Sequence, residues 1–263
     1  MDFTIKKYSM LLKCLQSNKY SFVCFKDFLR SDSKKTIILR HDVDLLPSNS
    51  LRFAKIQAKM GIRGTYYFRT VPESWDENII KEIEALGHEV GYHYENMDTC
   101  NGDIDKAWDD FRYHLDKLRK LVEVKTICMH GSPRSKFDNK DIWNKYDYRS
   151  LGIIGEPYYD VDFDKVFYLT DTGRRWDGWK TSVRDKVPQQ TEWVKQDLTF
   201  HSTQDIINKV VIGKMQNEVN MPNNIMFTMH PQRWTDGGLP WIKEFVLQNL
   251  KNQIKKVLIL NNL

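Results

Sequence analysis

Arg40-His41-Asp42-Val43-Asp44 ends a run of β-forming residues, Thr36-Ile37-Ile38-Leu39, and stops just before Leu45-Leu46-Pro47. Side chains alternate across a strand, so Asp42 and Asp44 should point to the same side, ~7 Å apart along the chain. Two carboxylates in one small space repel each other unless water or a cation neutralises them. The pattern therefore indicates either a metal site or a solvated strand end with a helix cap.

On both sides of this stretch, short β-rich runs alternate with helical stretches, which is typical of repeated βα units around a parallel sheet. At 263 residues and 41% hydrophobic content, the chain is in the size range of a single-domain α/β barrel. We predict one domain, with an N-terminal helical cap at 1–35, the strand-bearing part at 36–235 and a C-terminal helix at 236–263. Strands are predicted at 36–43, 64–69, 89–94, 125–130, 151–154, 166–170 and 225–230, and helices at 50–60, 76–86, 103–121, 138–146, 203–218 and 240–256.

The charge of the chain is nearly balanced, since 40 basic and 35 acidic residues leave a net charge of +5. Tracking nucleic-acid phosphates requires a concentrated basic face, so nucleic acid is excluded as the main partner. No apolar run reaches ~18 residues, and the start has no apolar core behind a basic flank, so we expect a cytoplasmic protein without a membrane span. The scattered cysteines, Cys14, Cys24, Cys100 and Cys128, indicate reduced thiols rather than disulfides.

Four of the seven histidines fall at or just after predicted strand ends: His41, His93, His130 and His230. The carboxyl ends of parallel strands open onto one face, so we expect these imidazoles to converge with the two aspartates. A single histidine after an apolar strand is more often a hydrogen-bonded core residue, but four in equivalent positions favour a site. Carboxylate and imidazole donors suit zinc or a similar divalent ion, which must keep one position open to water if it is catalytic.

These motifs resemble those of the polysaccharide deacetylase (NodB-homology) family, in their usual order over residues 36–235. Arg40-His41-Asp42-Val43-Asp44 resembles the first motif, whose first Asp is the catalytic base and whose later Asp binds metal. Gly87-His88-Glu89-Val90-Gly91-Tyr92-His93 resembles G-H-E-I-G-x-H, whose last histidine is a metal ligand, and Met229-His230 resembles the late motif whose histidine is the general acid. The resemblance implies a distorted (β/α)7 barrel, with Asp42 as base and His230 as acid.

The chain is most similar to a subgroup that we associate with surface-polysaccharide biosynthesis, such as that of O-antigen or capsule. The similarity lies in five segments in a fixed order, which together are far more specific than any one of them: R-H-D-V-D, G-Y-H-Y-E, H-G-S-P, T-D-T-G-R-R-W-D and H-P-Q-R-W.

One departure from the family pattern concerns the metal ligands. The parent family has a second metal-binding histidine four residues after the first, but position 97 of this chain is Met. Thioether sulfur is a poor ligand for hard or borderline cations. We therefore predict Asp44, His93 and His130 as the metal ligands, with Glu95 as the alternative to His130. The third family motif, an Arg and Pro segment, is replaced by His130-Gly131-Ser132-Pro133-Arg134, which leaves open what orders the base.

The resemblance predicts metal-assisted hydrolysis of an N-acetyl or similar acyl group on a sugar, with zinc as the expected ion and cobalt, manganese or nickel as alternatives. The expected substrate is a carbohydrate, either nucleotide-linked or lipid-linked. A non-catalytic glycan or sugar-nucleotide binding protein on the same barrel is the rival interpretation, for which Met97 is the main evidence. Another metal hydrolase, acting on a phosphoester or a cyclic amide, is the third, because fold and ligands do not fix the substrate.

Several residues near the motifs are candidates for substrate binding, and Glu95 is one of them. Arg174 or Arg175 would anchor Asp42 or a substrate anion, or would instead pair with aspartates at the surface, namely Asp171 and Asp177. Indole rings pack well on sugar faces but are first of all core material. The tryptophans in question are Trp176, Trp179 and Trp234.

Overall fold

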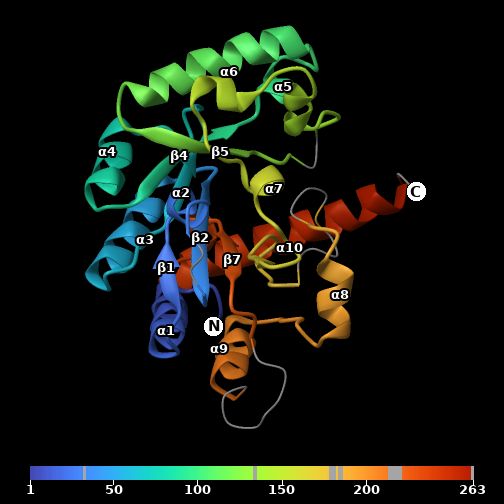
Figure 1. Cartoon of the computed structure of the whole chain (residues 1–263). Helices are drawn as coiled ribbons and strands as arrows, with labels where there is room; N and C mark the ends of the chain where they lie inside the picture. Colours follow the sequence, from blue (N-terminus) through green and yellow to red (C-terminus); the bar gives the residue numbers. More distant parts are fainter. Residues whose placement is uncertain (32–33, 133–134, 178–181, 183–185, 213–220, 262–263) are drawn as a thin grey trace. The chain divides into compact units, whose positions relative to one another are not determined.

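The computed structural model describes the chain except for residues 32–33, 133–134, 178–181, 183–185, 213–220 and 262–263 (Figure 1). The chain groups into two compact units. The first unit comprises Met1–Ser21, Lys34–Ile37 and Phe163–Leu263, and the second unit comprises Phe22–Ser33 and Ile38–Asp162. The prediction of one folding domain stays a prediction.

Parallel strands form the centre of the second unit. They are β2 (Thr36–Val43, whose first two residues belong to the first unit), β3 (Thr65–Phe68), β4 (Glu89–Tyr94) and β5 (Val124–Met129), in the order β5-β4-β3-β2. A short strand, β1 (Ser21–Val23), pairs with β2. The helical elements of this unit are α2 (Phe25–Phe28), α3 (Pro47–Lys59), α4 (Glu77–Ala85), α5 (Asn96–Thr99), α6 (Ile104–Arg119), α7 (Pro157–Asp160) and the 3₁₀ helices η1 (Asn139–Asn144) and η2 (Tyr148–Leu151).

Every residue of β2, β3 and β4 is buried, as expected for parallel strands that are covered on both faces. Helix α6 packs on β4 and β5 (Figure 1). Gly91 in β4 lies beside Tyr67 of β3, and a Cβ atom at Gly91 would come within 2.4 Å of the Tyr67 ring and 2.7 Å of the Thr126 carbonyl oxygen. The missing side chain is therefore what lets these three strands lie together.

The first unit contains the parallel pair β6 (Phe167–Thr170) and β7 (Ile225–Met229). Its helices are α1 (Ile5–Ser17), α8 (Gln190–Lys195), α9 (Thr203–Ile212), α10 (Gly238–Asn261) and the 3₁₀ helix η4 (Pro231–Arg233). Thr4 caps α1 by accepting a hydrogen bond from the Lys7 backbone N–H, and α1 packs against α9. Within the described part of the chain, no helix combines the length and the apolar character needed to cross a bilayer.

Most predicted strands agree with the structure, and those at 36–43 and 89–94 agree residue for residue. The strand predicted at 151–154 is wrong. Leu151 ends the 3₁₀ helix η2, and only Gly155, just beyond the segment, forms an isolated bridge, with Thr126, because Glu156 and Pro157 start a helical turn immediately afterwards. The predicted N-terminal helical cap contains the additional strand β1, and the predicted helix at 138–146 is the 3₁₀ helix η1. The fold is thus α/β with parallel strands, while closure into a barrel stays a prediction.

Candidate functional site

The residue that directly follows each parallel strand of the second unit is charged or titratable. Asp44 follows β2, Arg69 follows β3, Glu95 follows β4 and His130 follows β5. Parallel strands end at one edge of a sheet, so these four side chains are brought to the same edge. The contacts among them, together with those of His93 near the end of β4, define the candidate site.

Two imidazole rings point at one carboxylate oxygen. The Nε2 atoms of His93 and His130 lie 3.6 Å and 3.7 Å, respectively, from Asp44 Oδ1. The other nitrogen of the His93 ring, Nδ1, lies 2.9 Å from the Cys128 carbonyl oxygen, within hydrogen-bond distance, while His130 Nδ1 makes an ion-pair contact of 3.0 Å with Glu95 Oε2. In the neutral His93 ring the proton therefore sits on Nδ1, which leaves the Nε2 lone pair directed towards Asp44.

Arg69 connects two of the strand ends. Its Nε and Nη2 atoms donate to the two oxygens of Glu95, at 3.0 Å and 2.7 Å, and its Nη1 donates to the Asp44 carbonyl oxygen at 3.2 Å. Burial raises the pKa of Glu95, but contacts with His130 and Arg69 outweigh it and lower that pKa to about 2. Burial lowers the pKa of His130, but Glu95 and Asp44 outweigh it and raise that pKa. Glu95 is thus an ionised partner of both cationic groups.

Asp42 is held by Arg40 on the same strand. Arg40 Nε donates to Oδ1 at 2.8 Å and Nη2 donates to Oδ2 at 2.7 Å, and the two side chains are only 1% and 3% exposed. Asp42 Oδ2 also lies 3.8 Å from His93 Nε2. A guanidinium that grips both oxygens keeps the carboxylate ionised and fixed in direction. Arg40 therefore orients the Asp42 carboxylate, as a catalytic base at this position would require.

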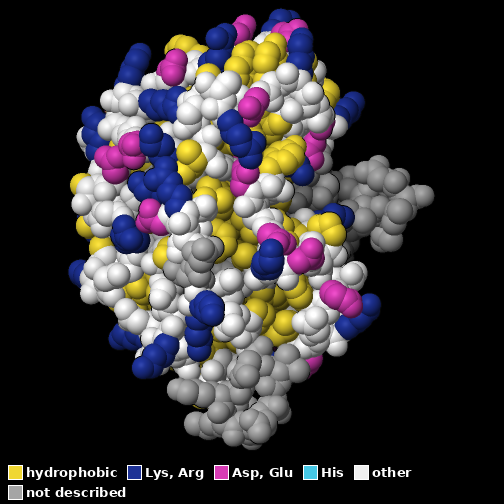
Figure 2. All heavy atoms as spheres, viewed as in Figure 1, with side chains coloured by type: hydrophobic (Ala, Val, Ile, Leu, Met, Phe, Trp, Pro, Cys, Tyr) yellow, Lys and Arg dark blue, Asp and Glu magenta, His cyan; other side chains and the backbone are white. Residues whose placement is uncertain are grey.

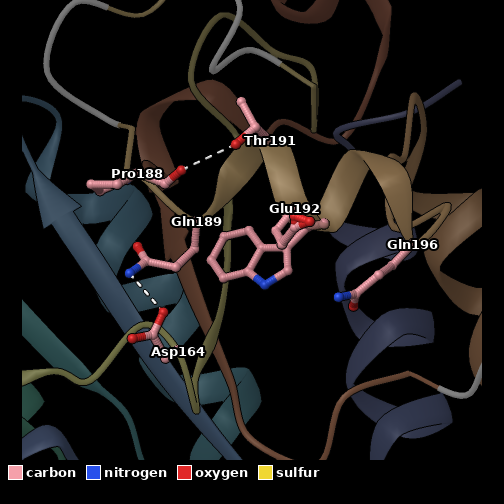
Figure 3. Close-up of a pocket in the computed structure, with 7 residues that line it drawn as sticks. Asp164, Pro188, Gln189, Thr191, Glu192 and Gln196 are labelled. Atoms are coloured by element: carbon pink, nitrogen blue, oxygen red, sulfur yellow. Dashed lines mark hydrogen bonds between the residues drawn. The ribbon is translucent and has the colours of Figure 1, made fainter.

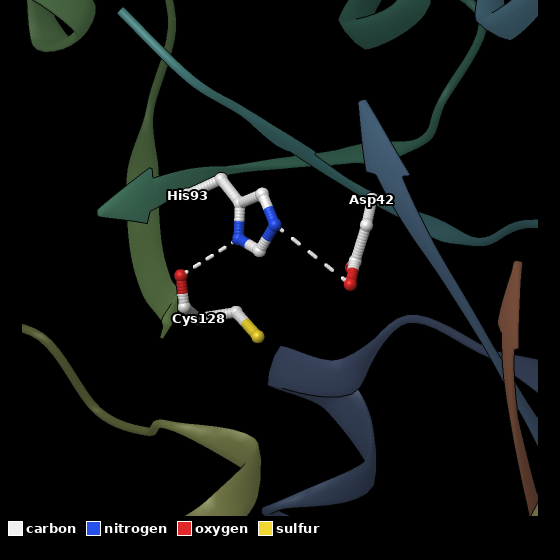
Figure 4. Close-up of side chains that lie close together, drawn as sticks. All are labelled: Asp42, His93 and Cys128. Atoms are coloured by element: carbon white, nitrogen blue, oxygen red, sulfur yellow. Dashed lines mark hydrogen bonds and ion pairs between the residues drawn. The ribbon is translucent and has the colours of Figure 1, made fainter. Parts of the chain in front are cut away.

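The donors near His93 fit a divalent ion of the zinc type. Asp44, His93 and His130 supply one carboxylate oxygen and two imidazole nitrogens, a donor set that such ions accept. A second possible set is Asp42, His93 and Cys128, whose ligand atoms all lie within 4.8 Å of one another (Figure 4). We favour the first set, because both oxygens of Asp42 already accept hydrogen bonds from a cation that would repel a metal ion. The role of Asp44, His93 and His130 as ligands stays a prediction.

The expected convergence of all four strand-end histidines is wrong for His41. This ring is fully buried, stacks on Tyr66, and has its nitrogens 3.0 Å from the Thr65 carbonyl oxygen and 2.8 Å from Gln57 Nε2. The reason is strand alternation, which turns His41 to the side opposite Asp42. Met97, which stands where the family that the sequence resembles has a histidine, is 5% exposed in α5.

His230, in the first unit, belongs to a second polar cluster. Its Nδ1 atom lies 2.6 Å from Oδ1 of the fully buried Asp171, which directly follows β6, while His230 directly follows β7. Arg233 Nη1 and Trp234 Nε1 also donate to Asp171, at 3.2 Å and 2.6 Å. Burial raises the pKa of Asp171, but His230 and Arg233 outweigh it and lower that pKa. The carboxylate thus fixes the orientation of the imidazole through Nδ1.

The two candidate arginines of the first unit have other partners. Arg175 donates to both oxygens of Asp177, at 2.5 Å and 2.8 Å, and so matches the pairing alternative, although Asp177 is buried rather than at the surface. Arg174 donates to the Trp241 carbonyl oxygen and lies over the Trp241 ring.

The two candidate tryptophans that the structure describes, Trp176 and Trp234, offer no free ring face to a sugar. Trp176 and Trp234 are each 1% exposed and lie edge to face, with ring centroids 6.2 Å apart. Stacking on a substrate would require one of them to become exposed. Trp179 lies outside the described residues.

Some residues of these clusters were not assigned a role from the sequence. Arg40 stands two positions before Asp42 on one strand, so alternation alone places both side chains on one side. Arg69 and Asp171 directly follow strands, as the predicted histidines do. In each case the sequence carries a signal, which is a charged residue on the same strand face as Asp42 or directly after a strand.

The first unit has a surface pocket that shares no lining residue with these clusters. It has a volume of about 360 Å³ and lies at α8, where it is lined by Asp164, Pro188, Gln189, Thr191, Glu192, Trp193 and Gln196 (Figure 3). None of the predicted site residues lines it. On the face shown in Figure 2, basic and acidic side chains are interspersed, in keeping with the nearly balanced charge of the sequence.

Comparison with known proteins gives no family model and no curated protein that matches the chain. Among solved structures, a CE4 family pseudoenzyme from Bacillus anthracis is 15% identical, with a TM-score of 0.42 over 86% of this chain, which spans only 63% of that protein's length. The catalytic domain of a peptidoglycan N-acetylglucosamine deacetylase from Eubacterium rectale is 16% identical, with a TM-score of 0.41 over 84% of this chain and 87% of that one. PdaA from Bacillus subtilis, a family 4 carbohydrate esterase, is 15% identical, with a TM-score of 0.38 over 93% of this chain and 84% of that one. Sequence identities of 15–16% and TM-scores of 0.38–0.42 do not assign an activity to this chain, so its chemistry rests on its own residues.

Proposed function

We propose that the protein is a metal-dependent hydrolase that removes an N-acetyl or similar acyl group from a sugar in surface-polysaccharide biosynthesis. The observation that carries the proposal is the approach of two imidazole Nε2 atoms to one oxygen of Asp44, beside a carboxylate, Asp42, that a buried arginine keeps ionised. The order of the sequence motifs supports the choice of reaction.

Asp44, His93 and His130 would hold the ion, with zinc expected and cobalt, manganese or nickel as alternatives. When bound, such an ion supplies Lewis acidity, which makes water a nucleophile at neutral pH and polarises a carbonyl group. Each imidazole arrives with Nδ1 already engaged, so little rotational freedom is lost when Nε2 becomes a ligand.

The remaining groups handle protons. Asp42, held ionised by Arg40, would accept the proton of the attacking water. His230, whose Nδ1 is held by Asp171, would give a proton from Nε2 to the departing amine nitrogen. The assignment of these roles follows the resemblance of the two motifs and is tested by substitution at each position.

The substrate is proposed to be an acetylated amino sugar, linked to a nucleotide or a lipid. The test is to load the purified protein with zinc or cobalt and to screen acetylated amino-sugar nucleotides, lipid-linked sugars and oligosaccharides for released acetate. Release that depends on Asp42 and His230 would support the proposal. Binding of one substrate at micromolar concentration without release would favour a non-catalytic sugar-binding protein, and turnover of a phosphoester or cyclic amide instead would favour another metal hydrolase.

A further inference from the structure

Glu95 stands at the start of α5 but does not cap it. The residue occupies the N-cap position, where a carboxylate could accept hydrogen bonds from the first backbone N–H groups of the helix, yet its side chain makes no such bond. Its two oxygens instead face Arg69, and Oε2 also lies 3.0 Å from His130 Nδ1. The side chain therefore serves the neighbouring strand ends and not its own helix.

This arrangement argues against Glu95 as a metal ligand. Both oxygens already accept charge-assisted hydrogen bonds from the guanidinium group, at 3.0 Å and 2.7 Å. An ion bound directly to Glu95 would stand beside that cation and be repelled by it. His130 is different, because its Nε2 atom faces Asp44 while its Nδ1 atom faces Glu95.

A carboxylate on the far nitrogen of a metal-binding imidazole fixes the orientation of the ring and strengthens it as a donor. We infer that Glu95 is a positioning residue for His130 as a metal ligand, and that Arg69 locks this pair to the strand end that carries Asp44. The inference rests on the proposed function. Compared with the family that the sequence resembles, the third ligand would come from His130 at the end of β5 and not from position 97 in α5, where Met97 is buried. Glu95 would then orient this third ligand.

The test measures the affinity for cobalt(II) by calorimetric titration of the metal-free protein. Glu95→Gln keeps the size of the side chain and removes its charge, so cobalt(II) should bind about 10–100-fold more weakly. Glu82→Gln is the matched control, because Glu82 forms an exposed ion pair of 2.7 Å with Lys55. Its affinity for cobalt(II) should equal that of the wild type.

A double-mutant cycle separates positioning from ligation or general stabilisation. If Glu95 acts through His130, then Glu95→Gln should change cobalt(II) affinity less than ~3-fold in a His130→Ala background. Equal losses in both backgrounds would overturn the inference, as would Glu95→Gln protein that binds cobalt(II) as tightly as wild type. If Glu95→Gln does not fold, Glu95→Asp enters the same cycle, with a smaller loss expected and the same outcomes decisive. Wild-type protein that takes up no cobalt(II) would refute the proposed function itself, which is a separate result.

Discussion

The pairing of Arg40 with Asp42 makes a quantitative prediction about stability. Replacing Arg40 by Met keeps most of the side-chain volume but leaves the Asp42 carboxylate, 3% exposed, without its cation and without two hydrogen bonds of 2.8 Å and 2.7 Å. Breaking a buried ion pair on one side costs about 3–5 kcal/mol. For a chain of this size each kcal/mol corresponds to about 2–4 °C, so the melting temperature of Arg40→Met should fall by about 6–20 °C.

The companion variant removes both charges. In the double variant Arg40→Met, Asp42→Asn the carboxylate charge at position 42 is removed together with its cation, so part of the lost stability should return. Both variants are compared with wild type by thermal unfolding in metal-free buffer at one pH. A fall of less than about 2 °C for Arg40→Met would refute the reasoning, since it would mean that the Asp42 carboxylate does not depend on Arg40 for its charge. A double variant less stable than Arg40→Met would refute it as well.

Three further predictions concern the candidate metal ligands, His230 and the buried Glu156. Asp44→Ala and His93→Ala should each abolish the rise in melting temperature that zinc gives to wild-type protein, and a variant that keeps the full rise would remove that residue from the ligand set. His230→Ala should lower turnover of a substrate by about 10²–10⁴-fold while zinc uptake, measured by mass analysis, is unchanged; a loss of zinc would instead make it a ligand. Burial raises the pKa of the fully buried Glu156 to about 7, so the folded state binds this proton more tightly than the unfolded chain, and the associated stability is lost as the pH rises through about 7. Glu156→Gln should therefore reduce the decrease in melting temperature between pH 5 and pH 8, and an equal decrease in both proteins would contradict this.

The local pattern of the sequence predicted most of the elements that position the site. Every residue of strands β2 and β4 is buried, and β-forming residues such as Ile37, Ile38 and Tyr92 recur along them between clear breaks, so both strands were predicted residue for residue. The strand predicted at 151–154 was wrong because a short apolar run has no preferred state of its own. There the local signals of the next turn, Glu156 as cap and Pro157 in the first helical position, prevail.

The candidate site was predicted less completely, for a physical reason. Asp44, His93 and His130 could be singled out because each is a possible ligand at a strand end. The contact of Glu95 with both Arg69 and His130 joins three strand ends that are far apart in the sequence, so no local pattern reports it. For His41 the prediction was wrong in the other direction, because a residue outside the site was included in it. His41 directly precedes Asp42 on the same strand, so its side chain points to the opposite side.

Gly91 limits how the strand that carries His93 can vary. Its backbone conformation is not the constraint; the constraint is space, because even a methyl group would lie 2.4 Å from the Tyr67 ring and 2.7 Å from the Thr126 carbonyl oxygen. A side chain at position 91 would meet the Tyr67 ring of β3 and the Thr126 backbone of β5. Strand β4 could accommodate it only by moving away from β3 or β5. Since His93 is two residues further on and points to the same side, any such separation would move its Nε2 atom relative to Asp44 and His130. The spacing of the candidate ligands therefore depends on a position that carries no functional group at all.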